Sequence, residues 1–195
     1  MSTPAENGKM HPKKFSLLLL MVSMTMLFAG LTSALIVRRG EGNWFNFDLP
    51  TTFIFSTIAV VLSSLAMWLA YRSAKIDEIG RTRILLLTTL FAGGLFVWFQ
   101  YAGWKDLAER GIFFVPGEGG ANGMVSGSFI IALVALHLLH LLGGLVFIAV
   151  VLMKTLSYQV HKKNLLSINL CNSYWHFVGA LWIYLYTFLY FATQL

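Results

Sequence analysis

The residues of this chain that could do chemistry are three histidines, a glutamine (Gln100) and an asparagine set within long apolar runs. His137 and His140 are three residues apart, so on a helix they share one face, which Gly144 continues one turn further. His176 belongs to a second stripe with spacings of four and three. That stripe comprises Asn172, His176, Gly179, Ile183, Tyr186 and Tyr190. We expect the two stripes to lie on two helices and to pack against each other.

These histidines allow two interpretations. A bis-histidine haem needs one imidazole on each side of the iron, and His137 or His140 together with His176 could supply one such pair. Ligating imidazoles normally have an orienting partner such as a carboxylate, and the apolar runs contain no acid. Interhelical hydrogen bonding is therefore the favoured interpretation. We expect all three histidines to be buried and hydrogen-bonded, with no metal or cofactor bound by the chain itself.

The elements that must position these residues are five apolar runs without Asp, Glu, Lys or Arg. They cover residues 15–37, 51–71, 84–104, 128–153 and 171–191. At about 1.5 Å of rise per residue, a helix of 21 residues crosses a hydrocarbon core of about 30 Å. Backbone hydrogen bonding inside lipid favours helices for such runs. The sequence thus predicts an all-α integral membrane protein with five transmembrane helices.

Composition and charge agree with that class and suggest an orientation. Hydrophobic residues make up 57% of the chain and charged residues 11%. Ten of the fourteen basic residues fall in the amino terminus and the second and fourth connectors, and four fall on the opposite side. The positive-inside rule then predicts a cytoplasmic amino terminus and an external carboxyl terminus. Because this bias accounts for the net charge of +6, a nucleic-acid partner is not required.

The chain is expected to form one domain. Residues 1–14 are predicted to be a polar cytoplasmic tail and residues 15–195 a five-helix membrane domain. Residues 111–127 contain Pro116 and several glycines, which predicts a turn-rich connector. The single cysteine, Cys171, is expected to be buried without a redox role.

Sequence motifs within these spans suggest a family. Tyr174-Trp175-His176-Phe177-Val178 followed by Trp182 is similar to the Tyr-Trp-His-Phe-Val-Asp-x-x-Trp signature of subunit III of the haem-copper oxidases. The pair His137-x-x-His140 with Gly144 resembles the His-Gly-x-His-x-x-x-Gly segment of that family, and residues 96–100 resemble its Phe-x-x-x-Gln stretch. Leu49-Pro50 resembles the opening of another family helix. Five helices are typical of the short bacterial form.

The resemblance implies a non-catalytic subunit III of a bacterial cytochrome c oxidase in aerobic respiration, located in the cytoplasmic (inner) membrane. Its implied partners are the haem-copper catalytic subunit I, subunit II and structural phospholipid, with a larger respiratory supercomplex as a further assembly. Haem and copper would lie in the partner subunits of this proton-translocating oxidoreductase. Two alternatives stay open: subunit III of a quinol oxidase, and an independent one-haem membrane cytochrome.

The resemblance also assigns roles to residues. Interhelical structural roles are expected for Gln100, His137, His140, Gly144, Trp175, His176, Gly179 and Trp182. Contacts with lipid head groups are considered for Arg72, Arg81, Arg83 and Lys162, with ordinary anchoring at the inner membrane edge as the favoured interpretation. In the family, phospholipid occupies a V-shaped cleft, which would here separate the first two spans from the last three.

The chain departs from the family pattern at three positions. Gly179 stands where the signature has Asp, Met24 stands where the family has Glu, and Gly103 replaces a further Glu. All eight acidic residues lie outside the apolar runs. The spans are therefore not expected to relay protons through carboxylates of their own.

Overall fold

The computed structural model describes residues 11–39, 49–109, 121–162 and 164–194, and the regular structure of this part of the chain is five long helices. They are α1 (Pro12–Arg39), α2 (Thr52–Lys75), α3 (Ile79–Glu109), α4 (Ala121–Leu156) and α5 (Leu166–Gln194). All five are long and apolar enough to cross a bilayer. The prediction of an all-α membrane protein with five spans is confirmed.

Each helix is longer than the apolar run that predicted it, because charged or polar residues at the ends of a run do not end the helix. The helix α3 continues through Asp106 to Glu109. Residues 121–127 were expected to form a loop but belong to α4, and residues 111–120 lie outside the described residues. The helix α1 begins at Pro12, so the last three residues of the predicted polar tail are helical. Proline is tolerated there because the first helical N–H groups have no helical acceptor.

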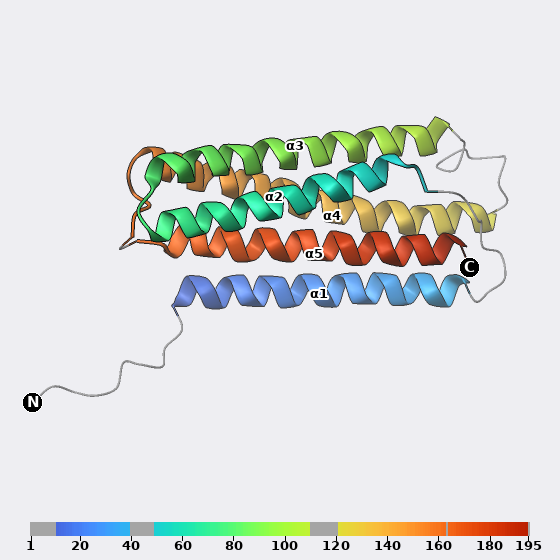
Figure 1. Cartoon of the computed structure of the whole chain (residues 1–195). Coiled ribbons are helices and arrows are strands. Elements are labelled where there is room, and N and C mark those ends of the chain that lie inside the picture. Colours follow the sequence, from blue (N-terminus) through green and yellow to red (C-terminus); the bar gives the residue numbers. More distant parts are fainter. Residues whose placement is uncertain (1–10, 40–48, 110–120, 163, 195) are drawn as a thin grey trace, which may run out of the picture.

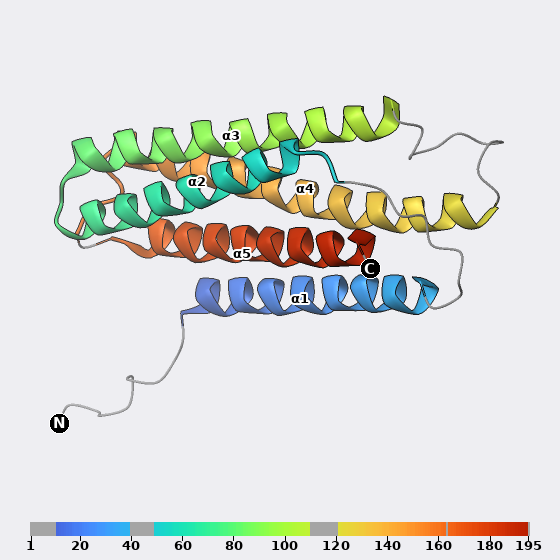
Figure 2. The same cartoon turned by 45° about the vertical axis from the view of Figure 1, so that its right-hand side comes forward.

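The helices lie side by side with their long axes nearly aligned, and α5 runs between α1 and α2 in both views (Figure 1, Figure 2). The most extensive interface joins α2 to α3, which are connected by the short turn at residues 76–78. The helix α5 packs against α1, α2 and α4, and α4 packs against α1, α3 and α5. We call the end of the bundle that carries Arg72, Arg83 and Lys154 the basic end.

The helix α1 has a different position from the one that the family resemblance implied. Among the described residues it contacts α4 and α5 and has no contact with α2 or α3. The expectation that the first two spans lie together on one side of a cleft is therefore wrong. Helices that follow each other in sequence need not be neighbours here, because a connector of about 12 residues can reach about 40 Å.

The interior and the surface of the bundle are both apolar. Trp175, Trp182, Phe28 and Phe96 are among the largest fully buried side chains. Large apolar side chains also cover the outside, where Met26 and Phe91 are 71% and 70% exposed. A surface of this kind is stable in a hydrocarbon environment and not in water. The chain is therefore a multi-pass membrane protein.

Candidate functional site

Four hydroxyl side chains of α2 form the main polar feature of the interior. Ser56 and Thr57 precede Ser63 and Ser64 by seven residues, which places both pairs on one side of the helix. The hydroxyls of Ser56 and Thr57 donate to the carbonyl of Phe53, and Ser63 donates to the carbonyl of Val60, each at 2.8 Å. Each oxygen can then accept a hydrogen bond from a neighbouring helix. We call these four residues the hydroxyl row.

Two buried tryptophans of α5 donate to the hydroxyl row. The indole N–H of Trp175 donates to Ser63 Oγ at 3.1 Å, and that of Trp182 donates to Thr57 Oγ1 at 3.0 Å. Both indoles are 1% exposed, so each needs an internal acceptor. The motif that suggested the family thus joins α5 to α2.

The other two members of the row bind Gln100 and His176. Gln100 Nε2 donates to Ser56 Oγ at 2.9 Å, which joins α3 to α2. His176 Nδ1 lies 3.1 Å from Ser64 Oγ. Gln100 is buried as expected, whereas His176 is only half-buried. The carbonyl oxygen Oε1 of Gln100 is buried and has no hydrogen-bond partner among the described residues.

Glycines make room for Trp175. A Cβ atom built at Gly144 would lie 3.1 Å from two ring carbons of Trp175, so the predicted close approach at Gly144 is present. A Cβ at Gly93 of α3 would lie 2.9 Å from Trp175 and 2.6 Å from Leu145. At Gly179 the nearest atom, Ser64 Oγ, would be 3.4 Å away, which is an ordinary contact. Trp175 is therefore held between α2, α3 and α4.

The expectation for His137 is only half right. The side chain is 1% exposed, but neither ring nitrogen has a hydrogen-bond partner among the described residues. Aromatic rings surround it instead, with centroids at 6.4 Å for Phe28, 6.1 Å for Phe96 and 5.3 Å for Trp182. These rings enclose the imidazole of His137 between α1, α3 and α5.

The two predicted polar stripes do not pack against each other. His176 and Gly179 both face Ser64 of α2. His140 lies beside Phe28 of α1, is half-buried, and its Nδ1 is 2.7 Å from the carbonyl oxygen of Leu136. Among the described residues no group of three or more His, Cys, Asp or Glu side chains is placed to hold a metal ion. The spacing correctly grouped His176 with Gly179 but did not predict the helix they face.

The arginines at the basic end have distinct contacts. Arg83 Nη2 donates to the carbonyls of Thr155 and Leu156 at 3.3 and 3.2 Å, and the guanidinium lies 4.6 Å from the ring centroid of Tyr158. Arg83 therefore caps the carboxyl end of α4. Arg72 lies over the ring of Trp68 at 4.7 Å, and Arg81 is 3.4 Å from Glu78.

The connectors at the basic end are also joined to each other. The backbone N–H of Lys162 donates to Asp77 Oδ1 at 3.2 Å. Asp77 lies in the turn between α2 and α3, and Lys162 lies between α4 and α5. This bond links two connectors that are far apart in the sequence.

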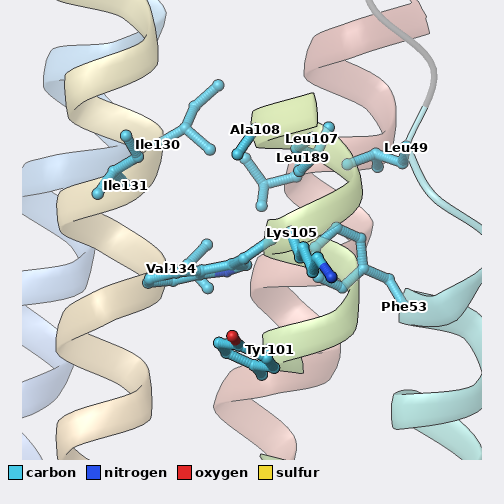
Figure 3. A pocket seen from close by; sticks show the side chains of 11 residues that line it. Leu49, Phe53, Tyr101, Lys105, Leu107, Ala108, Ile130, Ile131, Val134 and Leu189 are labelled. Carbon is cyan, nitrogen blue, oxygen red and sulfur yellow. The ribbon is translucent and has the colours of Figure 1, made fainter. Parts of the chain in front are cut away.

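A cavity of about 400 Å³ opens at the end of the bundle opposite the basic end. Figure 3 shows α4 side chains on one side of it and α3 side chains on the other, with Leu189 of α5 and Phe53 of α2 completing the wall. Its lining residues are Leu49, Phe53, Tyr101, Trp104, Lys105, Leu107, Ala108, Ile130, Ile131, Val134 and Leu189. We call it the α3–α4 cavity.

Reasoning from the sequence missed both the hydroxyl row and this cavity. The row has a readable signal, since two hydroxyl pairs recur after seven residues in an apolar run. The cavity has none, because it depends on how far apart the ends of α3 and α4 lie.

Comparison with known proteins adds a family to this geometry. A model of the family described as cytochrome c oxidase subunit III matches residues 57–194. A cytochrome c oxidase subunit 3 of Thermostichus vulcanus is 25% identical over 94% of this chain and 90% of its own length. A probable quinol oxidase subunit 3 of Staphylococcus saprophyticus is 25% identical over 84% of this chain and 81% of its own length.

A cytochrome c oxidase subunit 3 of Trypanoplasma borreli is 27% identical over 77% of this chain. The match covers 49% of that relative, so this chain spans about half its length.

Proposed function

Because this chain belongs to the cytochrome c oxidase subunit III family, we propose that it is the non-catalytic subunit III of a bacterial cytochrome c oxidase. Members of this family are components of haem-copper oxidase complexes. In this role residues 15–195 form one membrane domain that stabilises the catalytic subunit I and its lipids in aerobic respiration. Subunit II is the other proposed partner, and a larger respiratory supercomplex is a further assembly.

The observation that carries this proposal is the use of polar side chains inside the bundle. The motif residues Trp175, Trp182 and His176 bind hydroxyls of α2, as does Gln100 of α3. These contacts hold helices α2, α3 and α5 together. That arrangement supports a scaffold.

In this proposal the haems and copper belong to partner subunits. Aromatic rings enclose the imidazole of His137, whereas His176 lies against Ser64 of α2, so the two histidines face different neighbours and do not form a facing pair. The same contacts argue against the alternative of an independent one-haem cytochrome. A visible spectrum of the purified chain with a haem Soret band would reverse that choice.

The proposed location is the bacterial cytoplasmic membrane, with the basic end and the amino terminus inside and the carboxyl terminus outside. The positive-inside rule supports this orientation. Arg72, Arg81 and Lys162 are proposed to meet lipid head groups at that surface. Arg83 is assigned differently, because its guanidinium already binds α4 carbonyls and lies over Tyr158.

A quinol oxidase subunit III is the second candidate. The similarity to the probable quinol oxidase subunit 3 of Staphylococcus saprophyticus favours it, since that match covers 84% of this chain. Measuring oxygen uptake by the purified complex with reduced cytochrome c and, separately, with a quinol decides between the two donors.

Deleting the chain from its host tests the scaffold role. We expect the haem spectrum of the remaining complex to persist, because the redox centres lie elsewhere, while oxygen-reducing activity decays faster during turnover. Restoring the chain from a plasmid is the control. Loss of haem from a large subunit that still accumulates would contradict the proposal, as would a deletion complex with unchanged durability.

A further inference from the structure

The interhelical contacts described above do not account for the α3–α4 cavity. Protein interiors rarely contain voids much larger than a water molecule, and about 400 Å³ is within the range of small-molecule sites. Water is a poor occupant, because the lining is almost wholly apolar and offers a water molecule few hydrogen-bond partners. We propose that this cavity binds one acyl chain of a zwitterionic phospholipid whose phosphate lies at Lys105.

The rim of the cavity has the residue types found at the edge of a bilayer. Tyr101, Trp104, Lys105 and Ala108 recur at intervals of three and four residues, so they share one face of α3. Lys105 lies four residues before the end of α3, or about 6 Å along its axis. Tyrosine, tryptophan and lysine prefer this depth, where their apolar parts meet lipid tails and their polar tips meet head groups.

The cavity is open on its lipid side and closed inside. Tyr101 is 64% exposed, so the rim reaches the outer surface of α3. The floor consists of apolar side chains from four helices, Phe53, Leu107, Val134 and Leu189, none of them more than 4% exposed. An acyl chain that enters from the bilayer would therefore contact α2, α3, α4 and α5 together.

Lys105 at the rim and Glu109, which lies beyond the lining residues one turn further along α3, match a zwitterionic head group. Lys105 Nζ lies 3.7 Å from Glu109 Oε1, and the two side chains are 65% and 67% exposed. Such an exposed pair contributes only about 0–1 kcal/mol, so either member can readily exchange its partner. A phosphate can take Lys105 and an ammonium group can take Glu109.

This inference deepens the lipid-holding role proposed above and rests on it. The site differs from the cleft implied by the family resemblance, because it opens between the ends of α3 and α4, has only Phe53 of α2 in its wall and has no lining residue from α1. An acyl chain in the cavity would supply the van der Waals contacts that α3 and α4 do not make with each other at this end of the bundle.

Photocrosslinking tests the proposal on the intact complex, purified through a tag on this chain and reconstituted in phosphatidylethanolamine vesicles. One probe is a phosphatidylethanolamine with a diazirine in one acyl chain, and the other is a diacylglycerol with the same chain. Labelled peptides are identified by mass spectrometry. Recovery of the large subunit in each preparation reports on assembly, so failure of the subunit role is seen separately.

We expect the phosphatidylethanolamine probe to label the α3 and α4 peptides that line the cavity. Ala108→Trp, which fills the cavity from its rim, should lower this labelling about tenfold. Ala132→Trp on an exposed position of α4 outside the cavity is the matched control and should leave it unchanged.

Lys105→Gln should lower labelling by phosphatidylethanolamine about fivefold, because the lipid phosphate loses its positively charged partner. Labelling by diacylglycerol should stay unchanged, because that probe has no phosphate. Lys75→Gln at the basic end is the control for removal of a lysine. Equal labelling in Ala108→Trp and the parent chain would overturn the proposal. So would label found on a partner subunit that fills the cavity, or equal loss of both probes in Lys105→Gln.

Discussion

The α2–α5 and α3–α4 interfaces hold helices of one bundle by different means. At α2–α5, hydroxyls accept hydrogen bonds from Trp175 and Trp182 along the length of the contact. At α3–α4, Gly93 allows close approach to Leu145, Arg83 binds the end of α4, and the far end opens into the cavity. Side-chain hydrogen bonds join α2 to α5 in the middle of the bundle, whereas α3 and α4 are joined by close packing at Gly93 and by Arg83 at the basic end and separate at the cavity.

The largest effect is expected where both interfaces meet, at Trp175. Trp175→Ala removes an indole that contacts the regions of Gly93 and Gly144 and donates to Ser63. We expect the free energy of unfolding in mixed micelles to fall by about 3–5 kcal/mol, the usual cost of emptying a buried aromatic site. Trp98→Ala, at a side chain 65% exposed, is the control. Equal losses in the two variants would show that Trp175 does not join the interfaces.

Gly93→Leu tests the packed interface alone. The new side chain would collide with Leu145 and Trp175, so we expect a loss of about 1–3 kcal/mol and reduced recovery of the chain with its complex. Gly94→Leu is a control one residue away, since a Cβ there meets nothing within 4 Å. Equal changes in the free energy of unfolding for Gly93→Leu and Gly94→Leu would show that close packing at Gly93 does not hold α3 against α4.

Replacing histidines sharpens the contrast between satisfied and unsatisfied polar groups. His137→Phe removes a buried imidazole without a hydrogen-bond partner among the described residues, so unfolding free energy should rise by about 1 kcal/mol. His176→Phe removes the partner of Ser64 and should lower it. Thermal unfolding of both variants measures the two signs. A loss in His137→Phe would indicate that this imidazole has a partner.

The smallest effect is the coupling of one hydrogen bond. A double-mutant cycle of Trp182→Phe with Thr57→Val should give about 0.6 kcal/mol, the average for side-chain bonds between membrane helices. Thr88→Val is the control partner, because Thr88 donates to the carbonyl of Ile84 within its own helix. A coupling of zero for Thr57 would mean that shape alone holds α5 against α2.

The sequence predicted the helices and the buried residues of this chain far better than it predicted which helices lie next to each other. Five apolar runs gave five spans, and the motif residues Gln100, Trp175 and Trp182 are buried. Periodicity places His176 and Gly179 on one face, but it carries no information about which helix lies opposite. For this reason the pairing of the two stripes was wrong and the cavity could not be foreseen, whereas the wrong position of α1 came from the arrangement that the family resemblance implied.

The contacts of α1 have a consequence for synthesis in the membrane. Its described contacts are with α4 and α5, which begin more than 80 residues after it ends. A nascent chain emerges at about 5–20 residues per second, so α1 is inserted seconds before either neighbour exists. The α2–α3 hairpin, with its local contacts, can form during that wait. The helix α1 is thus synthesised before the helices against which it packs, and until they are inserted its apolar surface must be covered by lipid or by an insertion factor.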